Sequence, residues 1–284
     1  MTIAIFGATG HLGGLVIDSL IGRGIEPGDI LALGRNEERL AGLAARGLRT
    51  ARVDLADPAG LPAVLAGVQK ALLISASEPG ARVAQHRAVI DAAAEAGVGH
   101  LAYTSILQAP TSPLGLGVDH RATEDLIAAS GIPATLLRNG WYTENYAQDF
   151  ALARQTGVIV NSVGDGRIAT APRSDYAEAA AVVLTEPGHE GAVYELSGDN
   201  PWNYTEFAQA AQEVLGTPVR YEAVTAEQER EQLRALGLDE GTADFVSAMN
   251  ASIRENALAL SNGDLARLIG HPTQSLAETF RTWV

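Results

Sequence analysis

The feature that most constrains the fold is a glycine-rich loop near the amino terminus, from Gly7 to Gly13, with the sequence GATGHLG. A short apolar run, Ile3 to Phe6, precedes it, and apolar side chains recur at helical spacing after it as far as Gly22. In a dinucleotide-binding turn the three glycines permit a tight bend, close approach of backbone N–H groups to a pyrophosphate, and packing of the helix on the sheet. The loop therefore predicts that a dinucleotide binds at the amino terminus of the first helix. A purely structural glycine turn is the alternative.

The alternation of strand and helix continues through the first half of the chain. The pattern predicts further strands over 30–33, 48–53, 70–74, 101–104 and 134–138, and helices over 37–46, 82–96, 120–130 and 141–155, with a short helix opened by Pro58. Crossover helices between parallel strands cover both faces of a sheet. We therefore expect an α/β fold with a Rossmann-like, doubly wound parallel sheet, in a dinucleotide-binding domain over 1–150.

Beyond residue 150 the alternation loosens, which predicts a smaller carboxy-terminal α+β substrate lobe over 151–284, parts of which could return to the first domain. The pattern predicts strands over 158–160, 167–169, 193–196 and 219–223, a helix capped by Asp175 and ending at Leu184, and a helix over 205–215. The carboxylate run from Glu227 to Glu231 is typical of a solvated helix face.

Composition excludes several classes of function. The 284 residues carry 20 basic and 34 acidic side chains, a net charge of -14, so neither nucleic acid nor an anionic membrane is an expected partner. Cysteine is absent from the sequence, which removes disulfides and cysteine-ligated metals, and the scattered histidines predict no metal site. The amino terminus lacks the pattern of a signal peptide or membrane span, so we expect a cytoplasmic protein.

Cofactor choice is expected at the end of the second strand, where the sequence is Leu33-Gly34-Arg35-Asn36. An acidic residue there would bind the ribose of NAD, whereas Arg35 suits the 2′-phosphate of NADP. We therefore predict NADP (NADPH), with NAD as the alternative, because an exposed arginine can simply be solvated. Asp54, after the third strand, could accept from the adenine amino group or only cap the following turn.

Several other motifs resemble those of the NmrA-like atypical short-chain dehydrogenases, and among them most closely the type 2 NAD(P)H:quinone oxidoreductases; triphenylmethane reductases are near relatives. The motifs are the glycine loop, Arg35-Asn36, residues 73–77, 103–105 and 111–115, the segment LLRNGWY over 136–142, Asp175-Tyr176-Ala177 and Gly270-His271-Pro272. The resemblance implies NADPH bound at the carboxyl edge of the sheet and reduction of quinones or related aromatic compounds. A tailoring step on an aromatic polyketide is one such reaction, although no residue points to it.

The resemblance also implies site residues. By this resemblance, the residues expected to contact the cofactor are Gly7, Ala8, Thr9, Gly10, His11, Leu12, Arg35, Ser75, Ala76, Ser77, Asn139, Gly140, Trp141, Tyr142, Thr143 and, less directly, Arg173. Candidate walls for a flat aromatic substrate are Trp141, Tyr142, Tyr146, Phe150 and Trp202, with His86 near the nicotinamide end. Aromatic side chains at helical spacing are also typical of a core, and a lone histidine is often structural.

One departure concerns catalysis. Short-chain dehydrogenases use a tyrosine followed four residues later by a lysine, whereas the corresponding helix here has His120 and Glu124 at that spacing. We therefore name no catalytic acid or base and expect direct hydride transfer. The same absence motivates a second hypothesis, an NAD(P)-binding redox sensor of the NmrA type without turnover. The oligomeric state is left open, a homodimer being one alternative.

Overall fold

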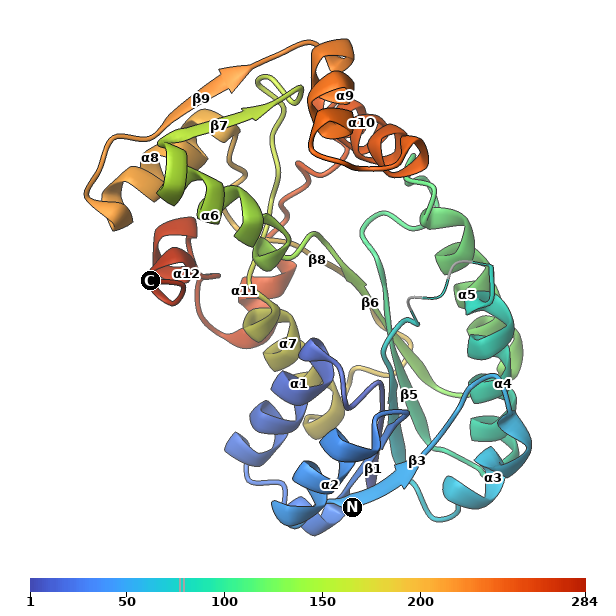
Figure 1. Ribbon diagram of the computed structural model, residues 1–284. Coiled ribbons are helices and arrows are strands. Elements are labelled where there is room, and N and C mark those ends of the chain that lie inside the picture. Colours follow the sequence, from blue (N-terminus) through green and yellow to red (C-terminus); the bar gives the residue numbers. More distant parts are fainter. Residues whose placement is uncertain (77, 79) are drawn as a thin grey trace.

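A parallel seven-stranded sheet forms the centre of the computed structural model, which describes residues 1–76, 78 and 80–284 (Figure 1). In spatial order its strands are β3 (Arg49–Arg52), β2 (Ile30–Gly34), β1 (Ile3–Phe6), β4 (Lys70–Leu73), β5 (His100–Ile106), β6 (Ala134–Asn139) and β8 (Val193–Leu196). The chain moves outward from β1 to β3 and then crosses to the other side of β1 with β4. The predicted Rossmann-like fold is confirmed, and its switch point lies at the carboxyl ends of β1 and β4, where ligands bind in such sheets.

Helices cover both faces of this sheet (Figure 1). One face carries α1 (His11–Gly22), α2 (Glu37–Ala45), α7 (Arg173–Thr185) and α11 (Asp264–Ile269), and the other carries α3 (Leu61–Val64), α4 (Arg82–Glu95) and α5 (Gly117–Ser130), with short 3-10 turns η1 (Pro27–Asp29) and η2 (Pro58–Gly60). Alternation along β1 explains the two cores, because Ile3 and Ile5 pack toward one face whereas Ala4 and Phe6 pack toward the other. Strands buried on both faces read as continuous apolar runs.

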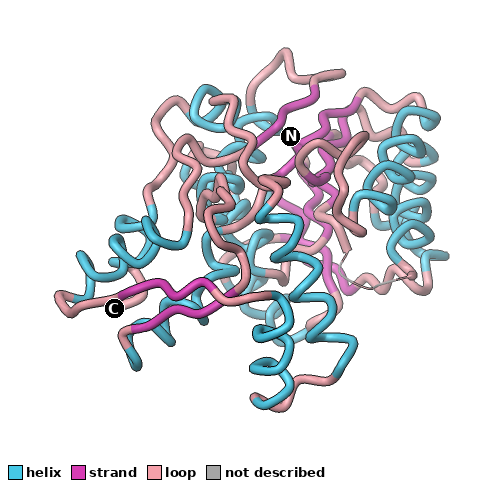
Figure 2. Tube along the Cα trace, turned by 90° about the horizontal axis from the view of Figure 1, so that it is seen from above, coloured by secondary structure: helices cyan, strands magenta, loops and turns pink. Residues whose placement is uncertain are grey.

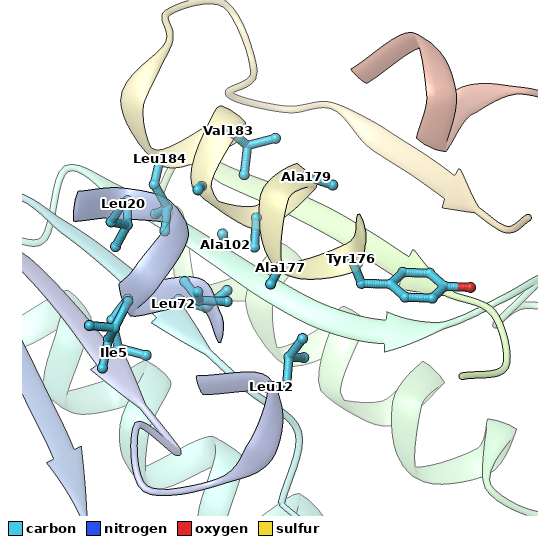
Figure 3. Packing of buried hydrophobic residues seen from close by; sticks show 14 of the residues in the cluster. Ile5, Leu12, Leu20, Leu72, Ala102, Tyr176, Ala177, Ala179, Val183 and Leu184 are labelled. Atoms are coloured by element: carbon cyan, nitrogen blue, oxygen red, sulfur yellow. The ribbon is translucent and has the colours of Figure 1, made fainter. Parts of the chain in front are cut away.

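Helix α7 packs closely on α1 and the sheet because its inner face is rich in alanine. Ala177 and Ala179 are fully buried, and Figure 3 shows them near Leu72 and Ala102 of the sheet. Small side chains let the helix backbone approach the strands. Helices α7 and α11 and strand β8 all come after residue 150, so the carboxy-terminal half of the chain returns to the central sheet.

The remaining elements form what we call the second lobe. They are η3 (Thr143–Tyr146), α6 (Ala147–Thr156), β7 (Val158–Asn161), α8 (Tyr204–Leu215), β9 (Arg220–Ala223), α9 (Ala226–Ala235), α10 (Glu240–Arg254) and α12 (Leu276–Arg281). Strands β7 and β9 pair in parallel, and Figure 2 shows this small sheet well apart from the main one. The core of the second lobe is aromatic.

Two predicted elements are wrong because tertiary bridges replace them. Residues 167–169 are not a strand: Ile168 makes isolated bridges to Trp202 and Leu258. The helix predicted from residue 141 begins later, because Tyr142 is extended and bridges Ala171. Neither set of partners is close in sequence, so local periodicity could not indicate them.

Asp175 is not the cap of α7, which begins at Arg173 with Pro172 as its N-cap. The Asp175 side chain is buried in the first turn, where its carboxylate accepts a hydrogen bond from the backbone N–H of Gln274 at 2.9 Å. Burial raises the pKa of this carboxyl above its usual value. Asp175 therefore fastens the carboxy-terminal segment to α7.

The carboxylate run on α9 is not uniformly solvated. Glu229 is buried, and its carboxylate accepts hydrogen bonds from the backbone N–H and the hydroxyl of Ser162 and from the amide of Asn250. A buried carboxylate is tolerated when it is fully hydrogen-bonded in this way. Glu229 thus ties α9 and α10 to the loop after β7.

Candidate functional site

A cavity of about 540 Å³ opens at the carboxyl ends of β1, β2 and β4. Its size is in the range of sites that bind small molecules and cofactors. The lining includes Gly7, Thr9, Gly10, Gly34, Arg35, Asn36, Arg39, Val53, Leu55, Ser75, Ala76, Glu78 and Gln85. The glycine loop, the arginine after β2 and the strand end after β4, all predicted as cofactor contacts, therefore meet at one opening.

The glycines of the loop are required by its geometry. Gly7 has φ of +82°, a left-handed conformation that favours glycine. A Cβ on Gly13 would lie 2.3 Å from the carbonyl oxygen of Gly7, so the first turn of α1 could not pack on the loop with any side chain there. The backbone N–H groups of Gly7 and Ala8 donate to the carbonyl of Leu33 at 3.1 and 3.0 Å, which fixes the loop to β2.

The amino terminus of α1 is suited to an anion. Its N-cap is Gly10, no side chain in the described residues caps it, and its first turn, which begins with His11 and Leu12, carries no acidic residue. Helix N-terminal N–H groups are unsatisfied within the helix and carry partial positive charge. A pyrophosphate would supply the missing acceptors.

Two arginines lie at the β2 side of the cavity. Arg35 is 61% exposed and forms an ion pair with Glu78. Arg39 donates from its guanidinium to the carbonyl of Thr9 at 2.6 Å, and the Asn36 side chain caps α2 by accepting from the backbone N–H of Arg39. Arg39 was not predicted; it lies in the first turn of α2, outside the Arg35-Asn36 motif.

Asp54 and Ser77 were also predicted to contact the cofactor. Asp54 accepts from the backbone N–H of Ala56 at 3.0 Å, so one of its oxygens has the turn-capping role. Adenine contact by Asp54 stays a prediction. Ser77 lies outside the described residues.

A buried histidine supports the backbone of the segment that follows β4. The backbone N–H of Ala76 donates to Nε2 of His86 at 2.9 Å, and Ser75 donates its backbone N–H to the hydroxyl of Thr104. Because Nε2 accepts, the proton of the neutral imidazole is assigned to Nδ1, which faces the hydroxyl of Thr123 at 2.9 Å. Burial lowers the pKa of His86 to about 3. His86 is fully buried, so it supports the loop from beneath; contact with a substrate stays a prediction.

The carboxyl end of β6 contains an unpaired acceptor. Asn139 is 5% exposed, and its amide nitrogen faces the Tyr142 hydroxyl at 3.3 Å, whereas Oδ1 has no partner among the described residues. At Gly140, a Cβ would lie 2.9 Å from the carbonyl oxygen of Leu196. A buried acceptor without a partner is rare, so this one indicates a place for a ligand donor.

Sequence comparison shows the family to which the chain belongs. A model of the NmrA-like family matches residues 1–267. The chain belongs to the NmrA-like family. It is 46% identical over 277 residues to quinone oxidoreductase 2 of Escherichia coli (strain K12), an alignment that covers 98% of this chain and 96% of that protein.

Two solved structures resemble this NmrA-like protein over nearly its whole length. One is an NADPH-dependent quinone oxidoreductase from Escherichia coli complexed with NADPH, with a TM-score of 0.93, 45% identity and 99% of each chain covered. The other is the triphenylmethane reductase of a Citrobacter species complexed with NADP(H), with a TM-score of 0.94, 36% identity and 100% of each chain covered. The predicted resemblance is confirmed.

The candidate aromatic walls of this NmrA-like protein divide into two groups. Tyr146, Phe150 and Trp202 are at most 6% exposed and pack in the core of the second lobe, with ring centroids of Tyr146 and Trp202 5.0 Å apart. Trp141 and Tyr142 are half-buried, and the Arg173 guanidinium lies 4.6 Å from the centre of the Tyr142 ring. Thr143 is buried and donates to the hydroxyl of Thr170. Trp141 and Tyr142 are thus the more accessible candidates.

His120 and Glu124 stand where short-chain dehydrogenases have their catalytic tyrosine and lysine, and both belong to hydrogen-bond networks in the protein interior. Nδ1 of His120 lies 2.8 Å from the Tyr103 hydroxyl, and burial lowers the pKa of His120 to about 4 and raises the pKa of Tyr103 well above its usual value. Glu124 pairs with Arg138 at 2.7 Å and accepts from the Ser105 hydroxyl. Neither ring titrates near neutral pH, and the Glu124 carboxylate is held in an ion pair with Arg138.

Among residues 1–76, 78 and 80–284, every helix is too short or too polar to span a lipid bilayer. The same residues contain no cluster of three His, Asp or Glu side chains that could hold a metal ion.

Proposed function

We propose that this NmrA-like protein is an NADPH-dependent oxidoreductase that reduces quinones or related electron-poor aromatic compounds by direct hydride transfer. The observation that carries the proposal is the cavity itself, in which an uncapped helix terminus and a pair of arginines border one opening at the switch point. Similarity to a quinone oxidoreductase and to a triphenylmethane reductase, both solved with this type of cofactor, supports it.

The described residues fit NADPH. The first turn of α1 would bind the pyrophosphate, and Arg35 and Arg39 would bind the 2′-phosphate at the β2 side. Val53 and Leu55 line the same cavity and would contact the adenine. When bound, NADPH supplies the hydride.

At the end of the cofactor opposite the adenine, Asn139 would orient the nicotinamide. Its unpaired Oδ1 is an acceptor at the carboxyl end of β6, and the carboxamide NH₂ of nicotinamide is a donor. Trp141 and Tyr142, half-buried just after Asn139, would stack on a flat substrate. Because His120 and Tyr103 do not titrate near neutral pH, the protein contributes orientation and exclusion of water rather than acid–base chemistry.

Steady-state kinetics with a panel of benzoquinones and naphthoquinones tests the proposal. We expect quinone-dependent oxidation of NADPH to NADP⁺, in which hydride transfer gives the hydroquinone anion and solvent supplies the proton that completes the hydroquinone. Trp141→Ala should raise the KM for quinone, because it removes a half-buried ring beside the proposed nicotinamide position. Absence of quinone-dependent oxidation across the panel would overturn the proposal. Tight NADPH binding without any oxidation would instead favour the redox-sensor alternative.

Substrate identity beyond this class has no support in the site. No described residue selects an aromatic polyketide, so we do not extend the proposal to polyketide tailoring.

A further inference from the structure

A carboxylate reaches across the mouth of the cavity to the predicted phosphate-binding arginine. Glu78 lies in the loop after β4 and forms an ion pair with Arg35, which follows β2 on the other side of β1. Its second oxygen accepts from the side-chain amide of Gln85 on α4 at 2.6 Å. All three side chains line the same cavity. Glu78 is therefore a wall of the site and belongs to the surface that a ribose would meet.

This carboxylate is charged at neutral pH. Hydrogen bonds from Gln85 and from Arg35, together with the charge of Arg35, hold the pKa of Glu78 below its usual value. A deprotonated carboxylate can only accept hydrogen bonds. Glu78 therefore accepts from hydroxyl and N–H donors and repels a phosphate.

We propose that Glu78 sets the selectivity between NADPH and NADH, by competing with the 2′-phosphate for Arg35 and by accepting a hydrogen bond from the free ribose 2′-hydroxyl of NADH. The inference rests on the proposed function, because it assumes that the cavity binds the adenosine half of a nicotinamide cofactor.

Two physical arguments support this role. In dinucleotide-binding folds the ribose hydroxyls are bound by an acidic residue near the end of the second strand, where this chain has Gly34 and Arg35. Glu78 supplies a carboxylate to that place from the loop after β4 instead. Conversely, a phosphate monoester carries about -1.5 to -2 charges at neutral pH, so it must bind Arg35 beside a like charge that already occupies one of the guanidinium nitrogens.

The pairing of Glu78 with Arg35 thus acts in opposite directions on the two cofactors. For NADPH, part of the gain from Arg35 is offset by loss of the ion pair and by repulsion from Glu78. For NADH, the ion pair can persist while Glu78 accepts from the hydroxyl. The wild-type protein is therefore expected to bind both cofactors, with NADPH bound more tightly because Arg39 lies at the same side of the cavity.

Glu78→Gln tests the proposal, since glutamine keeps the shape and removes the charge. Calorimetric titrations of the full chain with NADPH and with NADH should show the NADPH Kd falling about five- to tenfold and the NADH Kd rising about threefold or more. Glu37→Gln is the matched control: Glu37 follows Arg35 by two residues and pairs with Arg52, but it does not line the cavity. It removes the same charge and should leave the ratio of the two Kd values unchanged.

The outcomes separate this inference from the proposed function. If the wild type binds both cofactors and Glu78→Gln leaves the ratio unchanged or weakens NADPH binding, Glu78 is solvated or merely holds Arg35, and the selectivity role is wrong. If the wild type binds NADPH but no NADH, the hydroxyl-binding role is wrong. If the wild type binds neither cofactor, the proposed function fails as well.

Discussion

Replacing Arg35 by alanine should weaken the binding of NADPH and leave that of NADH nearly unchanged. A charge-assisted hydrogen bond contributes about 1.5–3 kcal/mol. Two features of the structure reduce this figure: the Arg35 side chain is 61% exposed, and it gives up an existing ion pair with Glu78 when it binds phosphate. We therefore expect a loss of about 1–2 kcal/mol, which corresponds to about a five- to thirtyfold increase in the NADPH Kd.

Titration of both cofactors against the wild type, Arg35→Ala and Arg52→Ala measures this effect. Arg52 is 58% exposed and pairs with Glu37, but it does not line the cavity, so its removal controls for the loss of one positive charge. The contacts of the glycine loop are common to both cofactors and cancel in the comparison. Equal losses for NADPH and NADH in Arg35→Ala would mean that Arg35 supports the loop rather than binding the 2′-phosphate. No loss for either would mean that Arg35 is only solvated.

Three other perturbations probe the loop and the buried polar groups. Gly13→Ala places a Cβ 2.3 Å from the carbonyl oxygen of Gly7, so it should lower the free energy of unfolding by about 1–3 kcal/mol and weaken the binding of both cofactors. Gly14→Ala, whose Cβ would meet open space, should be neutral or stabilising. Urea denaturation and cofactor titration measure the two effects, and equal effects for the two variants would contradict the reasoning. Glu124→Ala removes the bidentate partner of the half-buried Arg138 guanidinium, which keeps its ion pair with Glu195 at 2.8 Å, and should cost about 1.5–3 kcal/mol in urea denaturation. The exposed Arg281→Ala should cost less than about 1 kcal/mol, and an equally small loss for Glu124→Ala would refute the structural role. Burial lowers the pKa of His120 to about 4 from 6.5, so below about pH 6.5 the unfolded chain binds more protons and the free energy of unfolding falls on acidification. Unfolding midpoints at about pH 7 and about pH 5 should show a smaller fall for His120→Gln than for the wild type, and an equal fall would count against a neutral, buried His120.

The fold was largely predictable because its signals are local. The central strands β1, β2, β4 and β5 contain short apolar runs, and the helices between the strands carry apolar side chains at helical spacing. The errors occurred where distant segments decide the structure. Asp175 looks like a helix cap, but its partner is Gln274 in the carboxy-terminal segment. Glu229 looks like one residue of a solvated carboxylate run, but its partners are Ser162 and Asn250.

The candidate site was predictable in part for the same reason. The glycine loop and Arg35 follow directly from motifs that precede a helix, and both line the cavity. Glu78 and Gln85 were missed because they reach the cavity from a loop and a helix that no motif connects to β2. Arg39 was missed because it reaches the cavity from the first turn of α2, outside the Arg35-Asn36 motif.

The central claim, direct hydride transfer from NADPH to a quinone, is tested most directly by an isotope effect under single-turnover conditions. NADPH bearing deuterium at one or the other face of the nicotinamide C4 is bound to the protein without oxygen and mixed with a naphthoquinone, and its oxidation is followed. Bound NADPH presents one face to the substrate, so we predict a primary isotope effect of about 2 or more for one of the two stereoisomers and an effect near unity for the other. Oxidation with no isotope effect from either isomer, or no oxidation at all, would contradict the account.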